Sequence, residues 1–144
     1  MAKATVSDVF DATMQLIDEL NDRGESQTTD TEEYKNRTVG IMNILISECY
    51  PFSDEKDSSK LDSAWRAVQE FDDTLKGIDN TLALGVMPYG LAANLLTDEN
   101  PTAANYYQQR YEALLAAKRS RMQADVGEIE NVYGGIEYGY FSRW

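Results

Sequence analysis

The stretch "NTLALGVMPYGLAANLLTDENPTAANYYQQRYEALL", residues 80–115, decides the fold of this chain. Its first half, from about Asn80 to Leu96, carries apolar residues on nearly every face of a helix, which predicts that neighbouring elements bury it. Pro88 lies in the middle of this half, where it removes a backbone donor, and Gly85 and Gly90 flank it. We therefore expect a buried helix with a structural kink at these three residues, or two separate short helices.

The second half of the stretch begins with the clearest helix start in the chain. Asn100 is a good N-cap residue, and Pro101 occupies the first helical position, where its missing N–H costs nothing. This predicts a helix that runs to about Met122. Tyr106 is expected to be half exposed. The alternative is that part of this helix face is a contact surface. The predicted buried face consists of Ala104, Tyr107, Tyr111, Leu114, Leu115 and Met122.

Another helix is expected from about Val6 to Arg23. Apolar residues recur there at helical spacing and leave the aspartates largely on the opposite face. Thr5 and Asp8 resemble a capping box at its start, and Gly24 supplies a stop signal at its end.

A further helix is predicted to begin near Asp30, which can cap it, and to end before Pro51. Its wide apolar stripe favours a central position in the fold. Cys49 lies on this stripe, so we interpret the only cysteine of the chain as a buried structural thiol rather than a nucleophile.

These patterns predict an all-α protein, a bundle of about four main helices with an irregular C-terminal arm. The helical domain is expected to span residues 1–124 and the arm residues 125–144. The short segment around residues 64–76 fits either one helical turn or one short extended piece.

Composition limits the functions that this chain can have. Its acidic residues outnumber its basic ones 25 to 13, and the net charge of -12 argues against direct or sequence-specific nucleic-acid binding. Lys118, Arg119 and Arg121 are interpreted as cations near a helix C-terminus. No apolar run is long enough to cross a membrane and no signal peptide is recognised, so we expect a cytoplasmic protein.

The chain contains no histidine, which removes the commonest general base and the commonest metal ligand. Adjacent carboxylates, such as Asp72 with Asp73 and Asp98 with Glu99, are interpreted as caps and solvated charge. We therefore expect no catalytic residues, no metal site and no cofactor, and hence no enzyme.

The C-terminal arm is rich in aromatic residues that alternate with Gly134, Gly135 and Gly139. Either the arm packs on its own domain, or it docks on another molecule and is ordered there. We favour docking, because glycines make an isolated arm entropically costly to order. The expected contact residues are Tyr133, Ile136, Tyr138, Tyr140, Phe141 and Trp144.

The chain resembles the head–tail connector proteins of tailed bacteriophages and prophages, a family that includes adaptor and head-completion proteins. The features that carry the resemblance are the apolar "MPYGL" helix, the acidic "DENP" turn that opens a tyrosine-rich helix, and the "YGG" tail that ends in Arg143 and Trp144. It covers about residues 31–144.

The resemblance implies a virion structural protein that assembles as a homo-oligomeric ring on the portal protein and binds a downstream tail-completion protein. It also implies residence in the host bacterial cytoplasm during assembly and then at the head–tail junction. The alternative is a small acidic regulatory protein that sequesters a basic host or phage protein. That class predicts a one-to-one complex that salt weakens.

Overall fold

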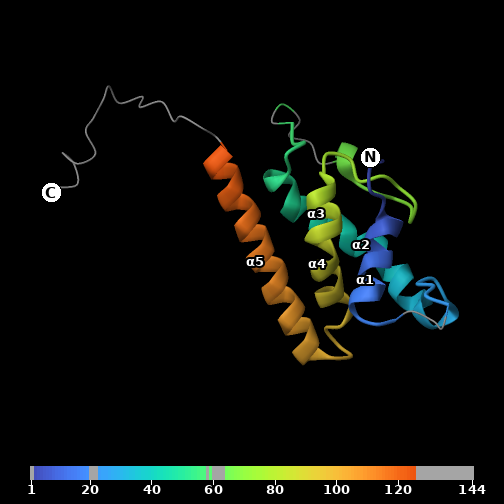
Figure 1. Cartoon of the computed structure of the whole chain (residues 1–144). Coiled ribbons are helices and arrows are strands. Elements are labelled where there is room, and N and C mark those ends of the chain that lie inside the picture. The colour runs from blue at the N-terminus through green and yellow to red at the C-terminus, as the bar shows by residue number, and fades with distance from the viewer. Residues whose placement is uncertain (1, 20–22, 58, 60–63, 126–144) are drawn as a thin grey trace, which may run out of the picture.

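The computed structural model describes residues 2–19, 23–57, 59 and 64–125. Within these residues the chain forms α-helices and short 3-10 helices and no β-strand, which confirms the predicted all-α bundle (Figure 1). The α-helices are α1 (Val6–Leu16), α2 (Glu32–Cys49), α3 (Asn80–Gly85), α4 (Met87–Leu95) and α5 (Pro101–Asp125), and the 3-10 helices are η1 (Thr29–Thr31), η2 (Tyr50–Phe52) and η3 (Ala64–Arg66).

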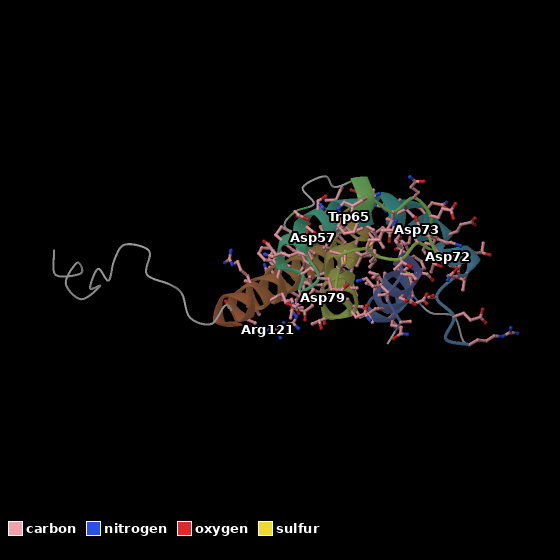
Figure 2. All side chains as sticks on the ribbon, turned by 90° about the horizontal axis from the view of Figure 1, so that it is seen from above. Asp57, Trp65, Asp72, Asp73, Asp79 and Arg121 are labelled. Carbon is pink, nitrogen blue, oxygen red and sulfur yellow. The ribbon has the colours of Figure 1, made fainter. Side chains whose placement is uncertain are left out.

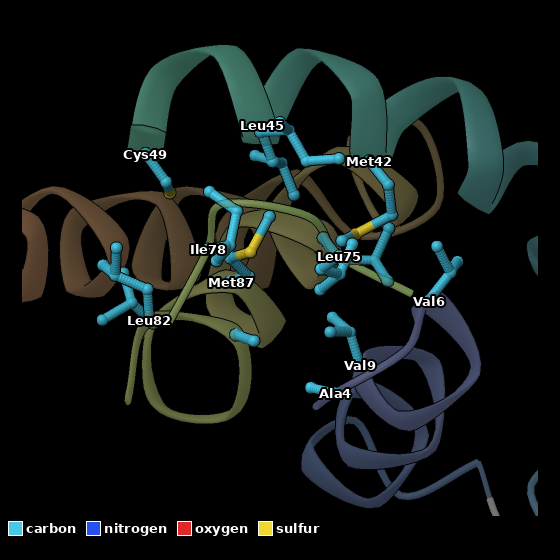
Figure 3. Close-up of a cluster of buried hydrophobic side chains, with 14 of the residues drawn as sticks. Ala4, Val6, Val9, Met42, Leu45, Cys49, Leu75, Ile78, Leu82 and Met87 are labelled. Atoms are coloured by element: carbon cyan, nitrogen blue, oxygen red, sulfur yellow. The ribbon is translucent and has the colours of Figure 1, made fainter. Parts of the chain in front are cut away.

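Helix α4 occupies the centre of the bundle. It contacts α1, α2, α3 and α5, and Figure 1 shows α5 along one side of it and α1 on the other. The apolarity of its sequence on nearly every face is therefore explained by burial. The core (Figure 3) takes its side chains from α1, α2, α3, the segment before α3 and α4 itself, and includes Val6, Val9, Met42, Leu45, Cys49, Leu75, Ile78, Leu82 and Met87.

Helix α1 has the predicted capping box of Thr5 and Asp8, but it ends at Leu16 and not near Arg23. The chain turns at Asp18, whose φ of 60° is left-handed. The N–H of Glu19 donates to the Met14 carbonyl at 2.8 Å, and that of Asp18 donates to Gln15 at 3.3 Å. This is the Schellman pattern that usually ends a helix at glycine, here with aspartate in its place.

Helix α2 is preceded by η1, and Asp30 lies inside η1 instead of capping α2. The hydroxyl of Thr31 accepts from the Thr28 N–H at 3.0 Å and so closes this turn. The predicted end is confirmed, since α2 stops at Cys49 and Pro51 lies in the 3-10 turn that follows.

The segment predicted as one kinked helix forms two short helices, the alternative stated above. They are separated at Val86, whose φ and ψ are -120° and -48°. Pro88 lies in the first turn of α4, where a missing backbone donor leaves no acceptor unpaired. The proline thus helps to start a new helix instead of bending an existing one. Gly85 ends α3, and Gly90 lies inside α4.

Both alternatives for residues 64–76 are realised in succession. The helical turn is η3, and the extended piece follows it and forms an isolated antiparallel bridge between Thr74 and Thr5. The Leu75 N–H donates to the Ala4 carbonyl at 3.0 Å, and the Val6 N–H to the Asp73 carbonyl at 3.0 Å. These bonds fix the start of α1 against the segment that leads to α3.

Helix α5 begins as predicted, because the Asn100 side chain accepts from the Ala103 N–H at 3.2 Å. It continues to Asp125, beyond Met122 and one residue into the predicted arm. Of the predicted face, Ala104, Tyr107, Tyr111, Leu114 and Leu115 are buried or partly buried, and the side chain of Met122 lies outside the described residues. The helix also buries Lys118, which was not placed on that face.

At Gly90, α4 closely approaches both α2 and α5. This packing gives the first testable prediction. A Cβ atom there would lie 2.9 Å from Leu45 Cδ2 of α2 and 2.9 Å from the Tyr111 ring of α5. Gly40, in the middle of α2, has nothing within 4 Å of the same position. We expect Gly90→Ala to be less stable than Gly40→Ala by about 1–3 kcal/mol, because both gain the same helix propensity and only the first overpacks the core. Urea unfolding measures both; equal stabilities would show that α4 has room to shift.

Candidate interaction surface

The described residues hold no group of three or more His, Cys, Asp or Glu side chains that could bind a metal ion. Likewise, no helix in the described part of the chain is long and apolar enough to cross a membrane. The hollows on the described surface are shallow. One of about 400 Å³ lies between α4 and α5 and is lined mainly by small and amide side chains, such as Ala93, Thr97 and Asn105.

The sequence-predicted site residues fall into two groups. The arm residues Tyr133, Ile136, Tyr138, Tyr140, Phe141 and Trp144 lie outside the described residues. The predicted kink residues separate: Pro88 starts α4, while Gly85 ends α3 with open space around it. Gly90 alone of these three has a demanding environment, between Leu45 and Tyr111.

Lys118, interpreted from the sequence as a cation near a helix C-terminus, lies in the last third of α5 and is only 5% exposed. Its ammonium lies 2.8 Å from Asp54 Oδ2 and 3.4 Å from Asp79 Oδ2. These contacts tie the C-terminal half of α5 to the loop after η2 and to the start of α3. No local signal indicated them, since the partners lie far away in the sequence.

Asp79 is the centre of this network. Its Oδ1 accepts from the Leu82 N–H at 2.9 Å and so caps α3, and its Oδ2 accepts from the Asp54 N–H at 2.8 Å. Burial opposes ionisation of Asp79, but these two N–H donors and the Lys118 ammonium outweigh it, so its pKa lies below the ordinary value. Burial likewise opposes the charge of Lys118, yet Asp54 and Asp79 together raise its pKa.

Cys49 is buried, as predicted, and lies in a second polar contact beneath α5. Its sulfur is 3.3 Å from the hydroxyl of Tyr111, which also donates to Glu48 Oε1 at 3.1 Å. Burial raises the pKa of Cys49 to about 11, although the Tyr111 hydroxyl works in the other direction. The thiol therefore stays protonated near neutral pH, which fits a structural role.

Tyrosine side chains gather where α4, α5 and the end of α1 meet. The ring of Tyr107 lies 5.4 Å from that of Tyr106 and 6.3 Å from that of Tyr89. The Tyr107 hydroxyl donates to the Leu16 carbonyl at 3.2 Å, and the guanidinium of Arg110 lies 5.3 Å from the Tyr89 ring. Tyr106, predicted to be half exposed, is 56% exposed. We name these four side chains, Tyr89, Tyr106, Tyr107 and Arg110, the tyrosine–arginine patch.

The tyrosine–arginine patch and the Lys118 network both include residues of α5, but they have different consequences. The network fixes the position of α5, and the patch leaves a large aromatic side chain of that helix in solvent. Tyrosine and arginine are the residue types enriched at protein contacts. The arrangement therefore suits recognition of another macromolecule.

Comparison with known proteins gives no relative: no family model, no curated protein and no solved structure matches this chain.

The Lys118 network predicts a large effect of one cation on stability. We expect Lys118→Met to reduce the free energy of unfolding by about 2 kcal/mol, because it keeps the apolar stem but leaves the mostly buried Asp79 carboxylate without its cation. The loss is smaller than for a fully buried pair, since Asp54 is largely exposed. The control is Arg119→Met, an exposed cation on the same helix, which should change stability by less than about 0.5 kcal/mol. Similar urea unfolding curves for the two variants would contradict the role of Lys118.

Asp79 predicts a specific pH dependence. Because its pKa is lower in the folded chain than in the unfolded one, its charge stabilises the fold at pH values above about 4, and this contribution is lost as the pH falls through the folded pKa. At pH 7 we expect Asp79→Asn to cost about 1–2 kcal/mol, with α3 still capped by the amide oxygen. The difference from wild type should shrink progressively below pH 4. Unfolding curves between pH 7 and pH 2 test this; a difference that stays constant over that range would rule out the charge as its source.

Proposed function

We propose that this chain is a structural subunit of the head–tail junction of a tailed phage or prophage, a connector that binds further copies of itself and the portal protein. The observation that carries the proposal is the position of α5 with the tyrosine–arginine patch. A long helix lies along the edge of the bundle (Figure 1), and the aromatic arm follows it in the sequence.

The packing of α5 supports this proposal. Its fully buried residues in the described part of the chain, Ala104, Tyr111 and Lys118, are spaced seven apart and form one narrow stripe. The rest of its surface is half-buried or exposed. A helix of 25 residues is about 37 Å long, so the protein offers an extended straight surface that its own core does not cover.

The sequence of the arm supplies the second support. The arm follows α5 without a predicted linker, and the Lys118 network fixes the helix only a few residues before it. Aromatic side chains such as Tyr138, Phe141 and Trp144 are able to bury large areas in a neighbouring subunit. That burial offsets the entropy lost when a glycine-broken segment becomes ordered.

The charge of the chain is compatible with a position around a DNA channel. A net charge of -12 repels phosphates at short range, so a ring of such subunits would let DNA pass without holding it. The same charge also suits the runner-up function, an acidic protein that sequesters a basic partner.

The arm gives the test of the proposed function. In particles purified from the phage that encodes the chain, quantitative mass spectrometry should find the wild-type chain at a fixed low copy number comparable with that of the portal protein. A chain that ends at Asp125 should keep its helical circular dichroism but be absent from particles. A full-length variant with Tyr138, Tyr140 and Phe141 changed to serine controls for arm length and should also be absent.

Two outcomes would contradict the proposal in different ways. Absence of the wild-type chain from infectious particles would remove the connector function and favour the acidic binding protein. Loss of helical structure on truncation would show that the arm belongs to the core and does not bind in trans.

A further inference from the structure

One side of α5 faces away from the rest of the bundle. The residues Tyr106, Arg110, Ala113, Ala117 and Arg121 follow one another at spacings of three and four along the helix and are all exposed. We call them the outer face of α5. Residues at such spacings share one side of a helix, so the outer face is continuous over four turns.

The outer face has a fixed aromatic end. Tyr107 anchors this end, since its hydroxyl bonds to the Leu16 carbonyl and its ring lies 5.4 Å from that of Tyr106. Arg110 is held over the Tyr89 ring at 5.3 Å. A partner would therefore meet one protruding tyrosine and one arginine that are already oriented, and little side-chain entropy would be lost on binding.

The charge of α5 is opposite to that of the chain. From Pro101 to Asp125 the helix carries Arg110, Lys118, Arg119 and Arg121 against Glu112 and Asp125. The chain as a whole has a net charge of -12. Because Lys118 is buried against Asp54 and Asp79, the exposed cations of this helix are Arg110, Arg119 and Arg121. The outer face itself has no carboxylate.

Three exposed carboxylates lie on α2 and on the segment before α3. Glu32 is in the first turn of α2, and Glu70 and Asp72 are in the segment before α3. The two segments meet through Phe71, whose ring lies 4.8 Å from Lys35 Nζ of α2. We call Glu32, Glu70 and Asp72 the acidic edge. In Figure 2, Asp72 and Arg121 lie toward opposite ends of the described structure.

We propose that the outer face of α5 binds the acidic edge of a second copy of this chain. Each copy has one surface of each kind on different sides, so the contact is heterologous and repeats from copy to copy. Such a contact builds a ring where the rotation closes. This inference rests on the proposed function, because the assembly that the contact would build is a ring around the portal.

Charge complementarity favours this heterologous contact over a symmetric contact between two identical surfaces. Two copies that paired through their α5 outer faces would place Arg110 and Arg121 against arginines of the partner, and like charges in contact cost several kcal/mol. Two acidic edges would repel each other for the same reason. The heterologous arrangement brings the two arginines to a surface of carboxylates.

The size of the surface predicts a weak contact. The outer face, about 24 Å long and about 10 Å wide, offers on the order of 240 Å², less than the roughly 800 Å² per partner of a standard stable interface. We therefore expect self-association of the isolated protein at low salt and high concentration only. A platform that lines up several copies would strengthen it.

Two charge-reversal variants test the contact. The first carries Arg110→Glu and Arg121→Glu on the outer face, and the second carries Glu32→Lys and Asp72→Lys on the acidic edge. Sedimentation equilibrium at about 50 mM salt and protein concentrations up to about 1 mM should show association of wild type and a dissociation constant about 100-fold weaker for each variant alone. In an equimolar mixture the intact outer face of one variant meets the intact acidic edge of the other, and the two reversed surfaces are also complementary, so the mixture should associate again with the two variants alternating.

Two further chains control for net charge. Lys56→Glu with Lys76→Glu changes the net charge as much as the first variant, but at exposed lysines outside α5; it should associate nearly as well as wild type. A chain with all four reversals has the wild-type net charge and exchanged signs on both surfaces, so it should associate with itself. Circular dichroism confirms that each variant is folded.

Several results would overturn the inference. These are a wild-type chain that stays monomeric under these conditions, association that both variants retain, a mixture that does not pair, or an outer face that binds a nucleic acid or an unrelated protein in preference to a second copy.

The proposed function fails separately from this contact. Association through these two surfaces by a chain that never enters particles would leave the contact standing and remove the connector function. Normal incorporation of both charge-reversal variants into particles would support the connector and contradict the contact.

Discussion

The structure depends on the close approach of three helices at Gly90. Helix α4 lies at the centre of the bundle, and at Gly90 the side chains of Leu45 and Tyr111 fill the space that a Cβ atom would need. Because protein interiors are packed nearly as densely as organic crystals, a small change at such a point moves whole helices. The position of α5 on α4, and hence of every surface on α5, is set there.

A second constraint fixes α5 farther along its length. Asp79 caps α3, accepts a hydrogen bond from the loop after η2 and pairs with Lys118. One carboxylate thus couples three segments that are distant in sequence. Tyr111 and Lys118 hold the helix at two points two turns apart. A surface helix that is fixed at two points can present its outer side without bending, which lowers the cost of ordering it against a partner.

Sequence analysis succeeded where the signal and the structure lie within a few residues of each other. The capping box at Thr5 and the start of α5 at Asn100 are of this kind. It failed at the end of α1, because the apolar spacing continues past Leu16 and a left-handed aspartate leaves no visible signal. The ion pair between Lys118 and Asp54 was not predicted, because it joins residues 64 positions apart. The interface residues expected in the arm fall outside the described part of the chain.

Under the proposed self-association, the distribution of charge would let an acidic protein both stay dispersed and assemble. At physiological salt the field of a charge decays over about 8 Å, so most of the -12 acts only weakly between two approaching copies. Charges in direct contact are screened much less. In the proposed contact the exposed arginines of α5 would therefore act at short range, while the acidic body would keep non-specific encounters unproductive. A chain with the same net charge but evenly mixed charges would neither stay dispersed nor assemble in this way.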